Sequence, residues 1–300
     1  MVPFRKDLMN KIVQRLLIFF VGLPLVVAIV ALDAINHLAL HLVMISVSLL
    51  AANEMYNLFS RTSKLLPKKL LVFFSGLLPV IAFITTFFHY NLELITYSFI
   101  FELLAVLAIS IFSADDFKES NNLISSSVFV ILYSGYLCTF ISRMTLFHNS
   151  AKFIATFLVM VFMNDSVAWF FGNLFGKNNR GIVKASPNKS VAGFIGGTLG
   201  SILAGIIAKL VWSDVFSGSI AKIILLAIII AISGSVGDLA ESVFKRSSGC
   251  KDSGAIVPGR GGILDSIDSV LMAAPVFYAL STLMYSVHDG QDFYNNILGL

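Results

Sequence analysis

The residues whose side chains could do chemistry are concentrated in one segment, residues 237–268. Read as helix, Asp238, Glu241 and Lys245 share one face, because helical neighbours lie three, four or seven residues apart. Carboxylates beside cations are what a divalent metal ion and a polyphosphate would need, whereas the alternative is a solvated loop between two helices. The segment holds five acids and four cations, in a chain that is 57% hydrophobic: Asp238, Glu241, Asp252, Asp265 and Asp268, with Lys245, Arg246, Lys251 and Arg260.

Between the two helical stretches lies a run that cannot be regular helix, Pro258-Gly259-Arg260-Gly261-Gly262. Its proline and three glycines predict a tight loop that leads into the next helix. The start of a helix offers unpaired backbone N–H groups and a positive dipole end, which suit a phosphate group. We therefore expect a phosphate-binding loop at this position.

This segment resembles the signature of the phosphatidate cytidylyltransferases, the CDP-diacylglycerol synthases. Two positions depart from the family pattern, because the family usually has His where this chain has Arg260 and Arg where it has Ser266. Our hypothesis is a relocated cation, with Arg260 meeting the phosphate that the family's arginine would meet, and the alternative is that Arg260 points to water and the enzyme is slow or inactive. The matching residues are Ser242, Lys245-Arg246, Lys251-Asp252, Pro258-Gly259, Gly261-Gly262, Asp265 and Asp268.

A second polar site is predicted near the middle of an apolar run, at Asn164-Asp165-Ser166. A charged Asp there is costly without a cation, a metal ion or water, so it implies a polar cavity that enters the membrane. The alternative is a structural Asp bonded to a neighbouring helix. With the loop that carries Ser186 and Lys189, it resembles two further motifs of the same family, although Ala192 stands where the family usually has Glu.

The composition predicts an all-α, polytopic integral membrane protein. Hydrophobic residues make up 57% of the chain and charged residues 13%, and the mean hydropathy is +0.87. A spanning helix needs about 20 apolar residues. Nine candidate spans meet or approach this length, at residues 16–32, 38–52, 70–88, 92–112, 123–141, 153–175, 191–212, 220–239 and 264–285.

The distribution of Lys and Arg predicts the orientation of these spans. With the N-terminus in the cytoplasm, 17 of the 21 Lys and Arg residues fall in inner segments. This asymmetry agrees with the positive-inside rule. We expect a multi-pass protein of the cytoplasmic membrane whose site faces the cytoplasm. The net charge of +4 is then an orientation signal and gives no reason to expect nucleic-acid binding.

We divide the chain into three parts: helices 1–3 (residues 1–90), helices 4–5 (91–150) and helices 6–9 with their loops (151–300).

Single residues outside the main segment also carry predictions. We interpret Glu54 as an interfacial acid, and Glu102 as a buried inter-helix contact or part of a subunit interface. In the seventh span, Gly193/Gly197 and Gly196/Gly200 predict close helix packing. Two cysteines, Cys138 and Cys250, do not indicate a disulfide framework.

The resemblance implies that CTP and phosphatidic acid give CDP-diacylglycerol and pyrophosphate, and that the enzyme is a homodimer. We expect Mg²⁺ as cofactor, shared by Asp238 and Asp265 at facing helix ends, with a second cation left open. The predicted catalytic residues are Asp238, Asp265, Lys245, Arg246 and Asp268. Residues predicted to bind substrate are Asn164, Asp165, Ser186, Lys189, Lys251, Asp252, Arg260, Gly261 and Gly262.

Two alternatives stay open at the level of the sequence. A CTP-dependent polyprenol- or phytol-type lipid kinase would share the membrane helices and the metal–phosphate loop, but it would transfer the γ-phosphoryl group. A transporter would also use glycine-rich helices and an intramembrane acid such as Asp165. It would be expected to show broken helices in two related halves, whereas the acids here gather in the C-terminal half.

Overall fold

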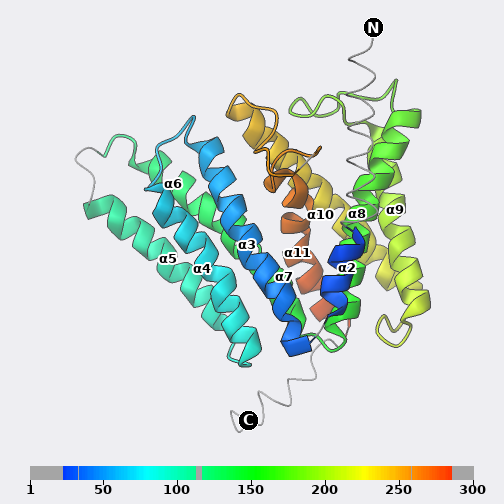
Figure 1. The fold of residues 1–300 in the computed structure, drawn as a ribbon. Helices are drawn as coiled ribbons and strands as arrows, with labels where there is room; N and C mark the ends of the chain where they lie inside the picture. The colour runs from blue at the N-terminus through cyan, green and yellow to red at the C-terminus, as the bar shows by residue number, and fades with distance from the viewer. Residues whose placement is uncertain (1–22, 33, 113–116, 258, 286–300) are drawn as a thin grey trace.

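The computed structural model is an all-helical bundle, and it describes residues 23–32, 34–112, 117–257 and 259–285 (Figure 1). Long apolar runs form helices because only a helix satisfies every backbone hydrogen bond within one segment in lipid. In chain order the helices are α2 (Leu23–Ala31), α3 (Ala34–Phe59), α4 (Lys68–Phe87), α5 (Glu93–Phe112), α6 (Ser120–Val130), a π-helical turn (Ile131–Tyr136), α7 (Thr139–Arg143), a 3-10 turn (Met144–Leu146), α8 (Ser150–Phe175), α9 (Val191–Val211), α10 (Ile220–Ser247) and α11 (Leu264–Met284).

Eight segments of the described chain are long and apolar enough to cross a membrane. They correspond to the second to ninth predicted spans, which confirms a polytopic all-α protein. The second span is longer than predicted, because α3 continues to Phe59. The fifth is a single span, Ser120–Leu146, built from several short helical pieces. The first predicted span, 16–32, lies partly outside the described residues, which contain only its second part as α2.

Two apolar cores meet along α3 and α11. One core joins α8, α9, α10 and α11, and the other joins α3, α4 and the segment from α6 to α7. In Figure 1, α4, α5 and α6 lie on one side and α8, α9 and α10 on the other, with α3, α7 and α11 between them. Because α3 contributes Met44 to the first core and Met55 to the second, it connects the two groups. The predicted division into three parts stays a prediction.

Helices α8 and α9 pack unusually closely, as the glycine spacing predicts. A methyl group placed on Gly200 would lie 2.8 Å from the carbonyl oxygen of Met163, and one on Gly196 would lie 2.5 Å from the Phe171 side chain. The glycines therefore let the backbone of α9 approach α8. This contact places the polar Asn164-Asp165 pair of α8 beside the start of α9.

Three loops gather at one end of the bundle, and we name them by the helices they join. The α3–α4 loop (residues 60–67) reaches the α10–α11 loop (248–263), where Arg61 donates to the Ser248 carbonyl oxygen at 3.4 Å. Arg246 donates to the carbonyl oxygen of Ala185 in the α8–α9 loop (176–190) at 3.3 Å.

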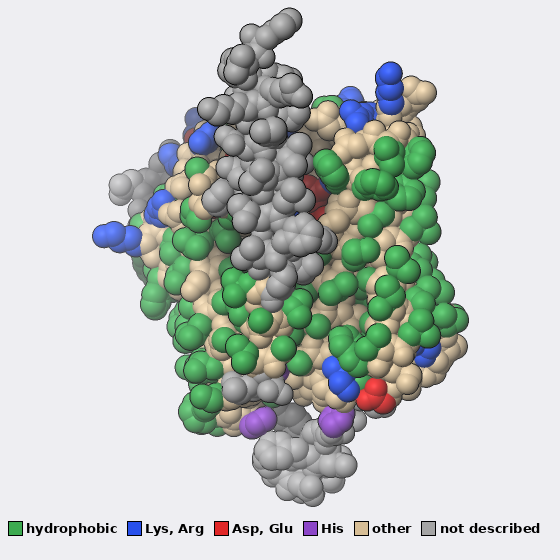
Figure 2. Space-filling view, turned by 45° about the vertical axis from the view of Figure 1, so that its right-hand side comes forward, with side chains coloured by type: hydrophobic (Ala, Val, Ile, Leu, Met, Phe, Trp, Pro, Cys, Tyr) green, Lys and Arg blue, Asp and Glu red, His purple; other side chains and the backbone are tan. Residues whose placement is uncertain are grey.

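Figure 2 shows hydrophobic side chains across the middle of one face and Lys and Arg toward its upper and lower parts, the pattern of a membrane-spanning protein.

Candidate active site

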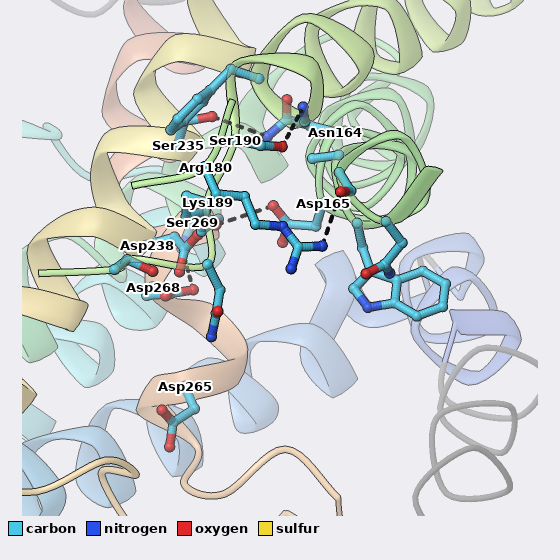
Figure 3. Close-up of a pocket in the computed structure, with 18 of the residues that line it drawn as sticks. Asn164, Asp165, Arg180, Lys189, Ser190, Ser235, Asp238, Asp265, Asp268 and Ser269 are labelled. Carbon is cyan, nitrogen blue, oxygen red and sulfur yellow. Dashed lines mark hydrogen bonds and ion pairs between the residues drawn. The ribbon is translucent and has the colours of Figure 1, made fainter. Parts of the chain in front are cut away.

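A polar cavity of about 510 Å³ lies among α8, α9, α10, α11 and the loops that join them (Figure 3). It brings together side chains that are up to about 100 positions apart in the chain. Acids and cations border it in similar numbers, which suits an anion together with its counterions. Its lining includes Asn164, Asp165, Trp169, Arg180, Ser186, Lys189, Ser190, Ser235, Asp238, Arg260, Asp265, Asp268 and Ser269.

The polar pair of α8 forms one wall of this cavity. Asn164 is buried and donates to the Ser235 hydroxyl of α10 at 3.5 Å. Ser269 of α11 donates to the Asp165 carboxylate at 3.4 Å. Asp165 also lies within electrostatic range of Lys189 and Arg260. As the sequence indicates, this acid borders a polar cavity inside a span, where cations and hydroxyl groups offset the cost of its charge.

Lys189 reaches into the cavity from the α8–α9 loop and forms an ion pair with Asp238 of α10. Burial lowers the pKa of Lys189 below its ordinary value of 10.5. The carboxylates of Asp165 and Asp268 oppose this shift, whereas Lys245 adds to it. Lys189 therefore pairs with one acid and lies in the electrostatic field of two others, at a position where a phosphate group would compete for it.

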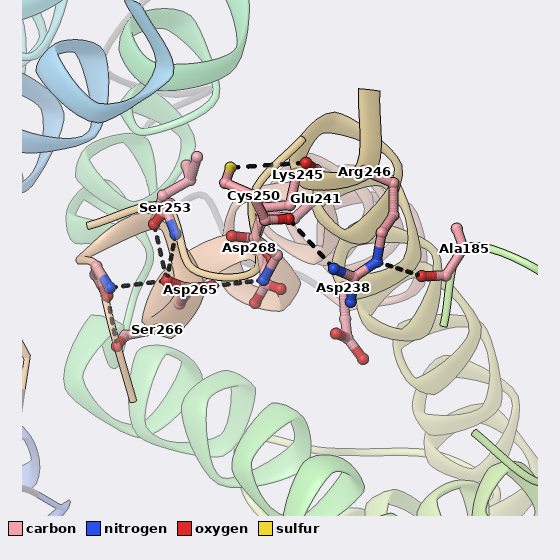
Figure 4. A network of polar contacts seen from close by, with 12 residues as sticks. Ala185, Asp238, Glu241, Lys245, Arg246, Cys250, Ser253, Asp265, Ser266 and Asp268 are labelled. Carbon is pink, nitrogen blue, oxygen red and sulfur yellow. Dashed lines mark hydrogen bonds and ion pairs between the residues drawn. The ribbon is translucent and has the colours of Figure 1, made fainter. Parts of the chain in front are cut away.

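A second lysine, Lys245, joins the end of α10 to the start of α11 (Figure 4). It forms ion pairs with Glu241 one turn earlier and with Asp265 at the start of α11. Glu241 is 1% exposed, and one of its carboxylate oxygens has no hydrogen-bond partner among the described residues. Lys245 itself does not border the cavity, so its contacts hold the two helix ends together.

Asp265, at the start of α11, binds the α10–α11 loop through hydrogen bonds. Its second carboxylate oxygen accepts from the Gly262 backbone at 2.7 Å and from both the backbone and the hydroxyl of Ser253 at 2.9 Å. An acid at a helix start is favoured because it satisfies unpaired N–H groups. Asp238 and Asp265, predicted to share a metal ion, are thus each engaged by a different lysine.

The donor chemistry around Asp238 suits a hard cation. Asp165, Asp238 and Asp268 border the same cavity, and Figure 3 shows Asp238 beside Asp268 and apart from Asp265. Carboxylate oxygens are the ligands that Mg²⁺ prefers. Within the described part of the chain, however, no three His, Cys, Asp or Glu side chains are arranged to hold a metal ion as they stand. Metal binding would require Lys189 to release Asp238.

The predicted tight loop is present in its described residues, 259–262, whereas its Pro258 lies outside the described part of the chain. Val257 and Gly261 exchange backbone hydrogen bonds of 2.8 and 3.0 Å. Gly261 has a φ of 116°, which disfavours any residue with a side chain, and a methyl group there would meet the Asp265 carboxylate. Arg260 leaves this turn and borders the cavity, as the relocated-cation hypothesis requires. Ser266 donates instead to the Gly262 carbonyl oxygen at 3.2 Å.

Several predicted site residues lie outside the cavity lining. Arg246 is exposed and donates to the carbonyl oxygens of Ala185 and Cys250, so it connects two loops. Lys251 and Asp252 are exposed in the α10–α11 loop. Gly261 and Gly262 shape the loop without bordering the cavity.

The interpretation of Glu54 as an interfacial acid is wrong. Its side chain is 2% exposed and binds the start of α11 from the end of α3. Sequence reasoning also missed Ser253, which bonds to Asp265, and Arg180, which borders the cavity. Glu54 falls just beyond the predicted span 38–52, and only the longer helix α3 places it inside a span, so the sequence carried no signal for this role.

The fold and this site define a multi-pass membrane protein with a charged cavity at one end of its helical bundle. Residues 13–284 match the model of the cytidylyltransferase family. Because that match covers most of the 300 residues, the chain belongs to this family.

Similar proteins with curated names agree with this assignment over part of the chain. The chain is 40% identical over 132 residues to a phosphatidate cytidylyltransferase of Staphylococcus haemolyticus, covering 44% of this chain and 50% of the relative. It is 39% identical over 122 residues to one of Staphylococcus saprophyticus, covering 41% and 46%. One of Staphylococcus aureus is 37% identical over 122 residues, with the same shares. The matched regions thus span about half the length of these relatives.

Proposed function

We propose that this protein transfers the cytidylyl group of CTP to phosphatidic acid, giving CDP-diacylglycerol and pyrophosphate. Membership of the cytidylyltransferase family supports the nucleotide, and the names of the partial matches support the lipid. The observation that carries the proposal is the cavity itself. It places Lys189, Arg180 and Arg260 beside the acids of α8, α10 and α11, next to membrane-spanning helices.

The reaction brings two anions together, so the site must neutralise both. An oxygen of the lipid phosphate attacks the α-phosphorus of CTP. The bond from that phosphorus to the oxygen bridging to the β-phosphate breaks, and pyrophosphate leaves with the bonding electrons. In this proposal Lys189, Arg180 and Arg260 hold phosphate oxygens, and Asn164 and Ser186 orient the bound groups. No covalent enzyme nucleophile is needed, so catalysis consists of positioning and charge stabilisation.

Magnesium is part of this proposal. When bound, Mg²⁺ would neutralise and polarise the phosphate oxygens of CTP. Asp238 is the predicted ligand best placed for it, because it lies beside Asp268 in the cavity, whereas Asp265 lies apart (Figure 3). Asp265 could serve as a ligand only after Lys245 releases it. While Lys245 stays paired with Asp265, that ion pair holds the end of α10 to the start of α11.

We further propose a cytoplasmic membrane location with the cavity facing the cytoplasm, where CTP is available. The excess of Lys and Arg in the predicted inner segments supports this orientation. The family resemblance also supports a homodimer, which the mass of the purified protein in detergent would test by light scattering.

The decisive experiment supplies the purified protein with phosphatidic acid, Mg²⁺ and CTP labelled in the cytosine ring, followed by lipid extraction. We expect the label in the lipid phase and one pyrophosphate released for each labelled lipid. Release of CDP with no label in lipid would instead identify a kinase. Absence of both products would contradict the proposed function, with heat-treated protein as the blank.

A further inference from the structure

We propose that Glu54 is a positioning residue, which holds the α10–α11 loop and the start of α11 in the geometry that binds CTP. This inference rests on the proposed function for its kinetic part only. Glu54 belongs to α3, outside the four helices that form the cavity, and it does not border the cavity. Its effect must therefore pass through the residues that it binds.

The Glu54 carboxylate accepts two backbone hydrogen bonds from the opposite half of the chain and shares the single hydroxyl proton of Ser253 with Asp265. The backbone of Ile263 donates to one oxygen at 3.0 Å, and the backbone of Leu264 donates to the other at 2.9 Å. The Ser253 hydroxyl lies 2.9 Å from that second oxygen. A buried carboxylate is stable here because the helix start supplies both unpaired N–H groups and a positive dipole end.

The loop is shaped to admit this carboxylate. A methyl group on Gly254 or on Gly262 would collide with a Glu54 carboxylate oxygen. Ser253 lies between two acids, because its hydroxyl is within 2.9 Å of both the Glu54 and the Asp265 carboxylates. Glu54 and Asp265 thus hold the same short stretch of loop from opposite sides.

The end of α3 also holds the beginning of the same loop. The Ser248 hydroxyl donates to the Leu58 carbonyl oxygen at 2.8 Å, and Arg61 donates to the Ser248 carbonyl oxygen at 3.4 Å. Both ends of the α10–α11 loop are therefore attached to α3. Glu54 is the buried charged contact among these, whereas Arg61 is exposed, so the loss of Glu54 should have the largest effect.

Arg260 is the residue that connects this scaffold to the substrate. It lies between the two attachment points and borders the cavity from an exposed turn. If the loop is released from α3, Arg260 and the start of α11 lose their fixed distance to Lys189 and Asp238. We therefore expect weaker binding of CTP when Glu54 is changed, even though Glu54 never meets the nucleotide.

The first measurement does not depend on activity. In Glu54→Gln the amide group presents a donor to backbone donors and removes the negative charge. Hydrogen exchange of peptides covering residues 253–266 should become about tenfold faster, because one charged cap is lost. Ser48→Ala is the matched control on the same helix: its buried hydroxyl donates to Ser75 of α4 at 2.8 Å, away from the loop.

The second measurement separates positioning from loss of fold. Glu54→Gln should raise the KM for CTP by about fivefold or more, whereas a fraction of unfolded enzyme lowers kcat alone. Ser253→Ala is a milder change on the other side of the contact. It should make hydrogen exchange of the same peptides faster and raise the KM for CTP, as Glu54→Gln does. Unchanged exchange in Glu54→Gln, or faster exchange with an unchanged KM in both variants, would overturn the proposal.

The two proposals fail in different ways. If the unaltered protein transfers no cytidylyl group to phosphatidic acid, the proposed function is wrong. The holding role of Glu54 is then decided by hydrogen exchange alone. If the unaltered protein is active and both variants match it in exchange and KM, the positioning role is wrong and the function stands.

Discussion

Each lysine of the site lies between carboxylates of different elements. Lys189 pairs with Asp238 and lies in the field of Asp165 and Asp268, while Lys245 binds Glu241 and Asp265. Buried charges need such partners, because an unpaired charge in a low-dielectric environment is costly. The two lysines differ in access, since only Lys189 borders the cavity. We expect substrate phosphates to compete with carboxylates for Lys189 and to leave Lys245 in place.

Asp238→Asn tests whether this acid takes part in the reaction. We expect cytidylyl transfer to fall at least about 100-fold, or roughly 2.7 kcal/mol, because a charged group close to the phosphates is lost. Initial rates at saturating Mg²⁺ measure the effect. Asp214→Asn is the control, since Asp214 also pairs with a lysine, Lys152 at 3.2 Å, but in the loop between α9 and α10. Near-normal rates for Asp238→Asn would remove it from the site.

The lowered pKa of Lys189 predicts a pH dependence. A lysine is charged below its pKa, so kcat/KM for CTP should fall as the pH rises through that lowered pKa, at a pH below 10.5. In Lys189→Arg the decline should move to higher pH, because a guanidinium stays charged. Lys184→Arg, in an exposed part of the same loop, should leave the profile unchanged. A decline at the same pH in the Lys189 variant would assign it to another group.

At the level of helices, the α8–α9 contact decides how the cavity is built. The glycines of α9 allow α8 to approach, and a methyl group on Gly197 would lie 2.7 Å from the Asn164 side chain. Close packing and site geometry therefore depend on the same residues. A glycine that would otherwise only weaken a helix is retained because the neighbouring backbone occupies the space of its side chain.

Gly200→Ala should lower the stability of the protein, because it disturbs the α8–α9 contact at a residue that does not border the cavity. The added methyl group would meet Met163 and Val167, both within 2.9 Å, and overpacking of this kind costs about 1–3 kcal/mol. Thermal unfolding in detergent should occur a few degrees lower. Leu199→Ala, at a half-exposed position on the same helix, should have less effect. Equal melting temperatures for Gly200→Ala and the unaltered protein would show that α8 and α9 can separate at no cost.

For the whole molecule, the orientation in the membrane decides which aqueous compartment supplies substrate to the cavity. Asp165→Cys, made in a chain lacking Cys138 and Cys250, should react with a membrane-impermeant thiol reagent added from the cytoplasmic side. CTP should slow the reaction, because the cavity that Asp165 borders would be filled. Leu199→Cys, on the apolar surface of α9, should not react. Labelling of Asp165→Cys only from the opposite side would reverse the proposed orientation.

The sequence alone determined the architecture and pointed to the candidate site. Membrane spans are predictable because each is a local run of apolar residues whose backbone bonds close within the helix. The density of charge after residue 237 and the isolated Asp165 likewise marked the site, since such groups are costly in a hydrophobic chain. The glycine loop was also predictable, because its conformation depends mainly on residues adjacent in the sequence.

Only the tertiary structure decided which groups are partners. Asp238 pairs with Lys189, and Asp265 with Lys245 and the loop, although the sequence favoured a metal ion shared by the two acids. Glu54 binds backbone groups about 210 positions away, and no local pattern in the sequence marks such a contact. The physical reason is that helix periodicity fixes the face on which a side chain lies, whereas packing between helices fixes what that face meets.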